Sequence, residues 1–251
     1  MIPTPIRQVL STIQTNGVQA LLMGGQACVF YGAAQFSKDI DLVLLAQEEN
    51  FSRLRAALEQ LKAKRIDVPR FDPALLARGH AVHFRCAAPG VEDLRIDIMT
   101  SLRDLPPFSV LWERRTVIAG DSGQEFHLLS VPDLVNAKKT QRMKDWPIID
   151  LLVAIHYREN AGAARPDWIE FWLQEARSPE LLAELAQRFP DEARAQSSRR
   201  QLLRFAFSGE IEALREALDA EVRVEQAKDR AYWAPLKAEF EAFRRAEREG
   251  G

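Results

Sequence analysis

The stretch that decides the fold is LLMGGQACVFYGAAQFSKDIDLVLL, residues Leu21–Leu45. Its apolar start is typical of a buried strand, and that strand stops at the glycine pair Gly24 and Gly25. A short helix is expected over Gln26–Tyr31, closed by the next glycine. Asp39–Leu45 has carboxylates at its start and a continuous apolar run behind them, which predicts a second strand. Strand, glycine turn, helix and strand in this order predict an α/β unit.

The segments on either side extend this unit. Pro5–Thr15 places its apolar residues on one helical face, so we expect a helix before the first strand, which begins near Val18. Glu48–Lys62 has the same helical spacing. Ala81–Cys86 and Asp93–Met99 are typical of strands, and the second alternates apolar and charged residues as a half-buried strand does. Together these segments predict an α/β (α+β) domain with a mixed sheet.

Helices are expected to dominate the rest of the chain. Two weaker strands, Thr116–Ile118 and Glu125–Leu128, are followed by Ser130, which has the pattern of a helix cap. We therefore place a boundary near Ser130, between a mixed-sheet domain over residues 1–129 and a mostly helical C-terminal region over residues 130–251. The helices expected there are Asp133–Met143, Ile148–Glu159, Trp168–Ala176, Glu180–Phe189 and a long charged stretch from about Glu210.

The composition narrows the class of protein. A chain of 251 residues with 47% hydrophobic content can bury a core, and a net charge of -2 excludes an overall basic nucleic-acid coat. Cys28 and Cys86 are far apart and match neither a metal-ligand nor a redox spacing, which favours a reducing compartment. No apolar run is long enough for a membrane span, and the N-terminus lacks the apolar core of a signal peptide. We expect a cytoplasmic protein without a membrane partner.

Three acids are the candidate reaction centre. Asp39 and Asp41, two residues apart on a strand, project from the same face and can share a cation. Their mutual repulsion favours a site where divalent ions neutralise them, although two acids at a solvent-exposed strand start are the plain alternative. Asp97 lies between Ile96 and Ile98 and therefore points to the opposite face from both. On a neighbouring strand it could join the first two acids.

The glycine pair is the candidate phosphate site. Gly24 and Gly25 follow a buried strand and open a helix, a context in which backbone N–H groups can approach phosphate oxygens closely. A tight strand-to-helix turn without a ligand is the alternative. The full phosphate-loop and dinucleotide glycine patterns do not occur in the chain, so ordinary ATPase and dehydrogenase functions lose their main support.

These motifs resemble the signature of the nucleotidyltransferase superfamily, which includes DNA polymerase beta, the aminoglycoside nucleotidyltransferases and nucleotidyltransferase-type toxins. In that signature a Gly-Gly or Gly-Ser pair precedes an Asp-apolar-Asp pair by about a dozen residues; here thirteen separate Gly25 from Asp39. The later LRIDIMT, Leu94–Thr100, resembles the strand of the third acid. LSVPDLVNAKKTQRMKDWPIIDLL, Leu129–Leu152, resembles a later family helix. The Gly-Gly form followed by Ala27 is most similar to the toxin-type members.

The resemblance implies roles for these residues. Asp39 and Asp41 would bind two Mg²⁺ ions, or Mn²⁺, while Asp97 would bind the acceptor-side metal and help to deprotonate the attacking hydroxyl. Gly24 and Gly25 would hold the triphosphate of an NTP such as ATP. The 1–129 region would then be the catalytic domain.

Three further nucleotide contacts follow from the resemblance. Ser37 matches a Ser or Thr that the family uses near the phosphates, and Lys138 or Lys139 would reach the triphosphate, with solvated lysines as the alternative. One departure concerns Gln35, which stands where many relatives carry an arginine. Its lack of charge bears on catalytic activity rather than on metal binding.

The leading hypothesis is therefore an enzyme that transfers a nucleoside monophosphate from an NTP to an acceptor. A toxin of a toxin–antitoxin pair, acting on tRNA or a protein and paired with a small antitoxin, fits the Gly-Gly form. An aminoglycoside-like small-molecule acceptor is the next option. A non-catalytic nucleotide-binding or interaction module with the same fold is the contrasting hypothesis: Gln35 supports it, and the three acids speak against it.

Overall fold

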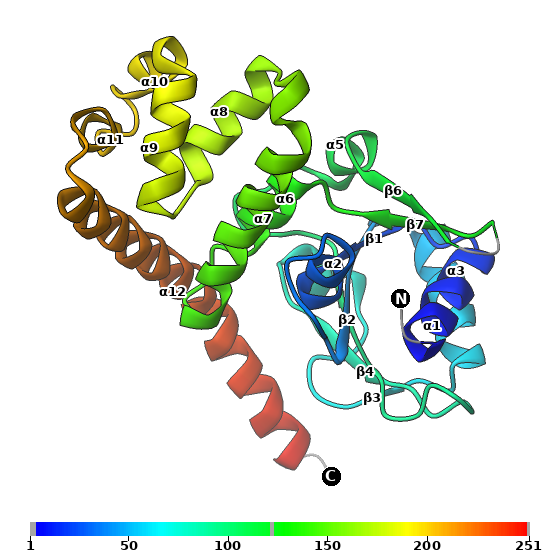
Figure 1. Cartoon of the computed structure of the whole chain (residues 1–251). Coiled ribbons are helices and arrows are strands. Elements are labelled where there is room, and N and C mark those ends of the chain that lie inside the picture. The colour runs from blue at the N-terminus through cyan, green and yellow to red at the C-terminus, as the bar shows by residue number, and fades with distance from the viewer. Residues whose placement is uncertain (1–3, 121–122, 250–251) are drawn as a thin grey trace. The chain divides into compact units, whose positions relative to one another are not determined.

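A computed structural model gives the structure of residues 4–120 and 123–249 (Figure 1). Its centre is a seven-stranded mixed sheet with strand order β3-β4-β5-β2-β1-β7-β6. β1 pairs with β2 antiparallel and with β7 parallel, and β2 pairs with β5 parallel. The strands are β1 (Ala20–Met23), β2 (Asp39–Leu44), β3 (Lys64–Arg65), β4 (Val82–Arg85), β5 (Arg95–Met99), β6 (Thr116–Ala119) and β7 (Glu125–Leu128). The predicted mixed sheet is confirmed.

Helices flank the strands and make up nearly all of the later chain, as the sequence predicts. Those of the first half are α1 (Thr4–Thr15), α2 (Gly24–Phe30), α3 (Glu48–Gln60), α4 (Pro73–Ala77), α5 (Phe108–Glu113) and α6 (Val131–Ala137). Those of the second half are η1 (Met143–Asp145), α7 (Trp146–Asn160), η2 (Ala161–Ala163), α8 (Pro166–Glu175), α9 (Pro179–Arg188), α10 (Pro190–Gln196), α11 (Leu203–Ser208) and α12 (Ile211–Glu249). None of these described helices combines the length and apolar character that crossing a membrane requires.

The sheet buries one face and leaves charged residues on the other. In β2 and β5 the apolar residues Ile40, Leu42, Ile96 and Ile98 are fully buried, while the acids that alternate with them are only partly buried. On the buried side the ring of Phe84 in β4 contacts Phe71, which in turn contacts Phe51 of α3. This apolar layer fixes the register of the strands, because a slip by one residue would turn the charged side chains into the core.

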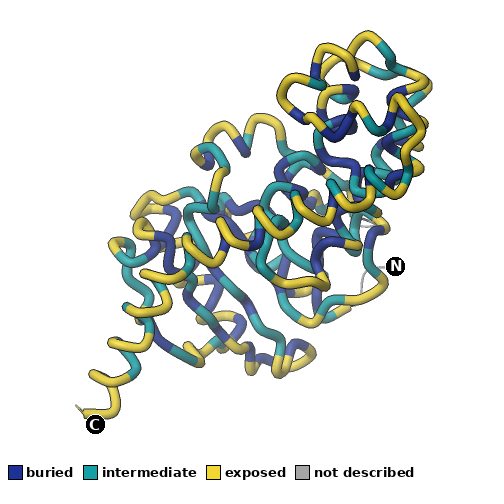
Figure 2. Tube along the Cα trace, turned by 90° about the vertical axis from the view of Figure 1, so that its left-hand side faces the viewer, coloured by how far each residue is buried: buried dark blue, intermediate teal, exposed yellow. Residues whose placement is uncertain are grey.

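The chain forms two compact units. The sheet unit contains the residues up to Phe30, Ala34–Ala137 and the chain from Tyr232 onward; the helical unit contains Tyr31–Ala33 and Lys138–Ala231. The sequence places the division near Ser130, whereas the units divide the chain after α6. The sheet unit also regains the end of the chain, since α12 begins in the helical unit and continues into the sheet unit. Most residues of α12 are exposed or partly exposed (Figure 2).

One predicted helix is shorter than expected. Asp133–Met143 was expected to be helical throughout, but α6 ends at Ala137. Beyond it the carboxylate of Asp145 accepts hydrogen bonds from Lys138 Nζ (3.2 Å), Thr140 Oγ1 (2.6 Å) and Arg142 Nε (2.8 Å). This buried polar cluster holds the segment in a turn, where a continued helix would separate the donors. The predicted cap of α6 is present, because the backbone N–H of Asp133 donates to Ser130 Oγ.

Candidate active site

The register of three strands brings the predicted acids to one face of the sheet. Asp41 of β2 lies directly opposite Asp97 of β5, and Asp39 lies opposite Arg95. On the other side of β5, β4 places His83 opposite Asp97. Directly opposed residues point to the same face, and neighbouring strands are about 4.8 Å apart. The structure therefore gathers Asp39, Asp41 and Asp97 on one patch of the sheet.

Two side chains hold Asp97 by one of its oxygens. Oδ1 accepts a hydrogen bond from Arg95 Nε at 2.6 Å and lies 2.8 Å from His83 Nδ1, which donates when it carries the proton. Among the described residues neither side chain nor backbone bonds to Oδ2. Burial raises the pKa of Asp97, but the hydrogen bonds from His83 and Arg95 outweigh it and keep the pKa below its usual value. Asp97 is therefore an anchored carboxylate with one oxygen available to a ligand.

Arg95 serves as the counter-ion of the acid patch. Its hydrogen bond to Asp97 raises its pKa, and the charges of Asp97, Asp39 and Asp41 raise it further against the opposing effect of burial. A single guanidinium thus faces three carboxylates. The patch retains an excess of negative charge, which a cation would offset.

The glycine turn packs directly against the acids. α2 starts at Gly24, whose φ of 67° favours glycine, and a Cβ atom there would overlap the carboxylate of Asp41. A Cβ atom at Gly25 would lie 2.6 Å from Oγ of Ser37. Ser37 Oγ in turn donates to the backbone carbonyl of Asp39 at 3.2 Å. The structure thus brings Gly24, Gly25 and Ser37 together with Asp39 and Asp41, leaving no room for side chains at either glycine.

The chemistry of this patch suits a hard divalent cation. Carboxylate oxygens are the preferred protein ligands of Mg²⁺ and Mn²⁺, and Asp97 Oδ2 is available. Within residues 4–120 and 123–249, no three Asp, Glu, His or Cys side chains are drawn together as a finished metal site. The acids are instead compensated by Arg95, so a bound cation would compete with this guanidinium.

The two predicted lysines lie in the helical unit and both have acidic partners. Lys138 is buried and pairs with Asp145, whose carboxylate is 2% exposed. Burial raises the pKa of Asp145, but Lys138, Thr140 and Arg142 lower it below the usual value. Lys139 donates to Glu175 Oε1 at 2.6 Å. Lys138 is thus built into the core of its unit, whereas Lys139 points toward a cavity.

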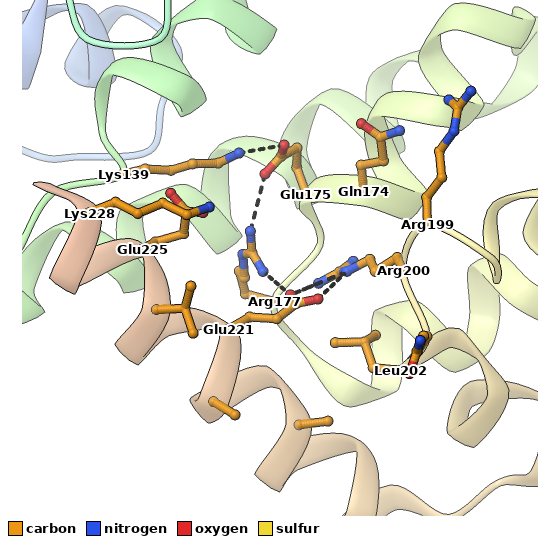
Figure 3. A pocket seen from close by; sticks show the side chains of 14 residues that line it. Lys139, Gln174, Glu175, Arg177, Arg199, Arg200, Leu202, Glu221, Glu225 and Lys228 are labelled. Atoms are coloured by element: carbon orange, nitrogen blue, oxygen red, sulfur yellow. Dashed lines mark hydrogen bonds and ion pairs between the residues drawn. The ribbon is translucent and has the colours of Figure 1, made fainter.

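That cavity has a volume of about 680 Å³ and lies within the helical unit (Figure 3). A chain of ion pairs crosses it from Lys139 through Glu175, Arg177 and Glu221 to Arg200. Arg200 is buried and also donates to the backbone carbonyls of α8 and of the residue after it. Each cation in this chain has an acidic partner, so the network has the character of a structural brace for the helical unit.

Two residues of the site escaped sequence analysis. His83 was expected only to point away from His80, and Arg95 was treated as the polar half of an alternating strand. Both flank buried residues at the two-residue period, which places them on the face of Asp97 once the strand order is known. The exposed residues near Asp39 include Gln35, at the predicted departure from the family, and Lys38.

No protein-family model and no curated protein sequence matches the chain. It is similar to three solved structures. JHP933 from Helicobacter pylori is 16% identical with a TM-score of 0.41, covering 93% of this chain and 94% of that one. A candidate nucleotidyltransferase from H. pylori is 16% identical with a TM-score of 0.43, covering 90% and 94%. The antibiotic-resistance factor ANT(2'')-Ia is 12% identical with a TM-score of 0.35, covering 88% and 92%.

Proposed function

We propose that the protein transfers a nucleoside monophosphate from an NTP to an acceptor, in a reaction that depends on divalent metal ions. The observation that carries this proposal is the opposition of Asp41 and Asp97 across β2 and β5, with Asp39 on the same face and the glycine turn packed against Asp41. Phosphoryl transfer needs little covalent help from a protein, but it needs positioned charge and tight phosphate contacts. This patch offers both.

Each acid has its own part in this scheme. Asp39 and Asp41, on one strand, would hold both metal ions, and Asp97 would hold the acceptor-side ion through Oδ2. Bound Mg²⁺ or Mn²⁺ would polarise the transferred phosphoryl group and offset the charge of the triphosphate. The lowered pKa of Asp97 makes it a weak base, so orienting the acceptor side is its main contribution and proton uptake a lesser one. His83 and Arg95 would keep its carboxylate in a fixed orientation.

The nucleotide would bind by its phosphates at the glycine turn. With no side chain at Gly24 or Gly25, the backbone can approach phosphate oxygens, and Ser37 Oγ is at hand as a further donor. Lys138 and Lys139 are the proposed lysine contacts. Of the two, Lys139 is the better candidate, because Lys138 would have to leave its buried partner Asp145.

The proposed setting is the cytoplasm, with RNA or a protein as acceptor and a small antitoxin as partner. This follows the motif similarity to toxin-type members. A small aminohydroxyl acceptor is the second candidate function, and a non-catalytic nucleotide-binding module is the third. Incubation of the protein with each α-labelled NTP and Mg²⁺ in the presence of total RNA, lysate protein or an aminoglycoside tests these proposals together. Label must appear on one acceptor and disappear in the double variant Asp39→Asn with Asp41→Asn.

A further inference from the structure

A row of cations runs across the sheet beside the acid patch. Lys64 of β3 lies opposite Arg85 of β4, Arg85 lies opposite Arg95 of β5, and Arg95 lies opposite Asp39. Directly opposed residues share a face, so the row lies on the same face as the three acids. At about 4.8 Å per strand, Arg85 starts about 10 Å and Lys64 about 15 Å from Asp39.

The outer two members of this row are exposed cations without an ionic partner. Neither Lys64 nor Arg85 has a hydrogen bond or ion pair to any described residue, and both are exposed at the sheet surface. Nearby arginines differ in this respect: Arg65 pairs with Glu247 at 2.8 Å, and Arg78 pairs with Glu239. Arg95 is already engaged by Asp97. The sheet unit thus compensates the neighbouring cations but leaves Lys64 and Arg85 open.

This charge pattern selects between the acceptor classes. Two uncompensated cations on the sheet face of the reaction centre repel a polycationic aminohydroxyl compound and attract a polyanion. A strand of nucleic acid carries a phosphate at every nucleotide, so it can leave its reacting hydroxyl at the acids while neighbouring phosphates reach the row. A protein acceptor has no such regular negative charge.

We infer that Lys64 and Arg85 form a phosphate-binding row for the acceptor, and that the acceptor is a nucleic-acid strand. This inference rests on the proposed function and narrows its acceptor. The row binds the strand through backbone phosphates, which makes binding insensitive to sequence and strongly dependent on salt.

Charge reversal at the row, Lys64→Glu with Arg85→Glu, tests the inference. The matched control is Arg245→Glu with Arg248→Glu, which makes the same charge change in the sheet unit at exposed residues of α12 without ionic partners. Binding of a fluorescein-labelled single-stranded RNA of mixed sequence is measured by anisotropy in Mg²⁺ without NTP, over a series of salt concentrations. NTP affinity is measured separately for each protein by calorimetry.

For the row variant we expect RNA affinity to fall by about tenfold or more at low salt, and the salt slope to shrink by about 1.4, or 0.7 for each lost phosphate contact. The control should keep both the affinity and the slope, and all three proteins should bind NTP equally. Equal RNA binding by the row variant and the control would overturn the inference. So would loss of NTP affinity in the row variant alone, because the cations would then serve the nucleotide.

The labelled-transfer assay separates this inference from the proposed function. If the wild type labels RNA and the row variant labels it equally well, the row is not the acceptor site although nucleotidyl transfer stands. If the wild type labels neomycin and not RNA, transfer again stands and the nucleic-acid acceptor is wrong. If RNA binding depends on the row but no acceptor is ever labelled, the proposed function fails instead.

Discussion

Gly24 and Asp41 are packed so closely that the carboxylate of Asp41 occupies the space that a side chain at position 24 would need. The residues lie at the junction of β1 with α2 and on β2, and the strands pair so that Met23 is opposite Asp41. The phosphate turn and the metal-binding acids are therefore one packed unit. A change in the turn is expected to disturb the acids, and a change in the acids to disturb nucleotide binding.

Gly25→Val should weaken nucleotide affinity more than it weakens folding. The added side chain would enter the space of Ser37 Oγ, 2.6 Å from its first carbon, and obstruct the approach of a phosphate. The control is Gly162→Val, at a position where a Cβ atom meets no other atom within 4 Å. Calorimetry with Mg²⁺ and NTP, alongside thermal melting, separates the two effects. Normal nucleotide binding by folded Gly25→Val would make the turn purely structural.

Asp39→Ala with Asp41→Ala should abolish metal-dependent nucleotide binding. Without both carboxylates the metal ions lose their protein ligands on β2, and the NTP loses the positive charge that holds it. We expect the NTP-induced rise in melting temperature seen with Mg²⁺ to disappear. The exposed acids Asp191 and Glu192 on α10, both changed to Ala, provide the control. A wild-type protein that responds to none of the NTPs would refute the catalytic proposal at once.

Arg95→Met should tighten divalent-metal binding in the absence of nucleotide. Arg95 is the counter-ion of the acids, so a metal ion must displace or compete with its charge. Removal of an opposite charge at hydrogen-bonding distance is expected to improve Mn²⁺ affinity by about tenfold. Arg85→Met is the control, since Arg85 is the next cation of the row but has no contact with the acids. Weaker Mn²⁺ binding by Arg95→Met than by the control would show that Arg95 supports the metal site.

Asp145→Asn should destabilise the helical unit by about 3 kcal/mol, because it leaves the ammonium of Lys138 buried without a counter-charge. The pH dependence follows from the lowered pKa of Asp145, whose usual value is 3.8. A lowered folded-state pKa contributes stability above the usual pKa and loses it as the pH falls through the folded-state pKa. Denaturant unfolding should therefore show the difference from wild type at neutral pH and a smaller one in acid. An unchanged free energy of unfolding at neutral pH would contradict this role of Asp145.

The central elements of the sheet could be predicted because the chain marks them locally. Glycines end β1 and α2, and a continuous apolar run identifies β2 behind its acids. β3 could not be predicted, since Lys64 and Arg65 form a strand only by pairing with β4. The early end of α6 was likewise hidden, because Asp145 collects donors from a segment that is helical by pattern alone.

The candidate site was half visible in the sequence. The period of two residues predicts that Asp39 and Asp41 share a face, but only the strand order shows which residue faces Asp97. Once β4 is known to adjoin β5, the same period identifies His83 and Arg95 as its neighbours. Spacing along the chain could not give these contacts, since they depend on the pairing of strands.

The most direct measurement is transfer of label from each α-labelled NTP by the wild type and by Asp97→Asn, side by side. Asparagine keeps the size of the side chain and an oxygen that can accept from His83 and Arg95, but it lacks the charge that the acceptor-side metal needs. We expect Asp97→Asn to fold and to bind the metal-nucleotide through Asp39 and Asp41. Its transfer to the acceptor should fall by orders of magnitude. Equal labelling by the two proteins would contradict the account and make Asp97 an ordinary strand residue.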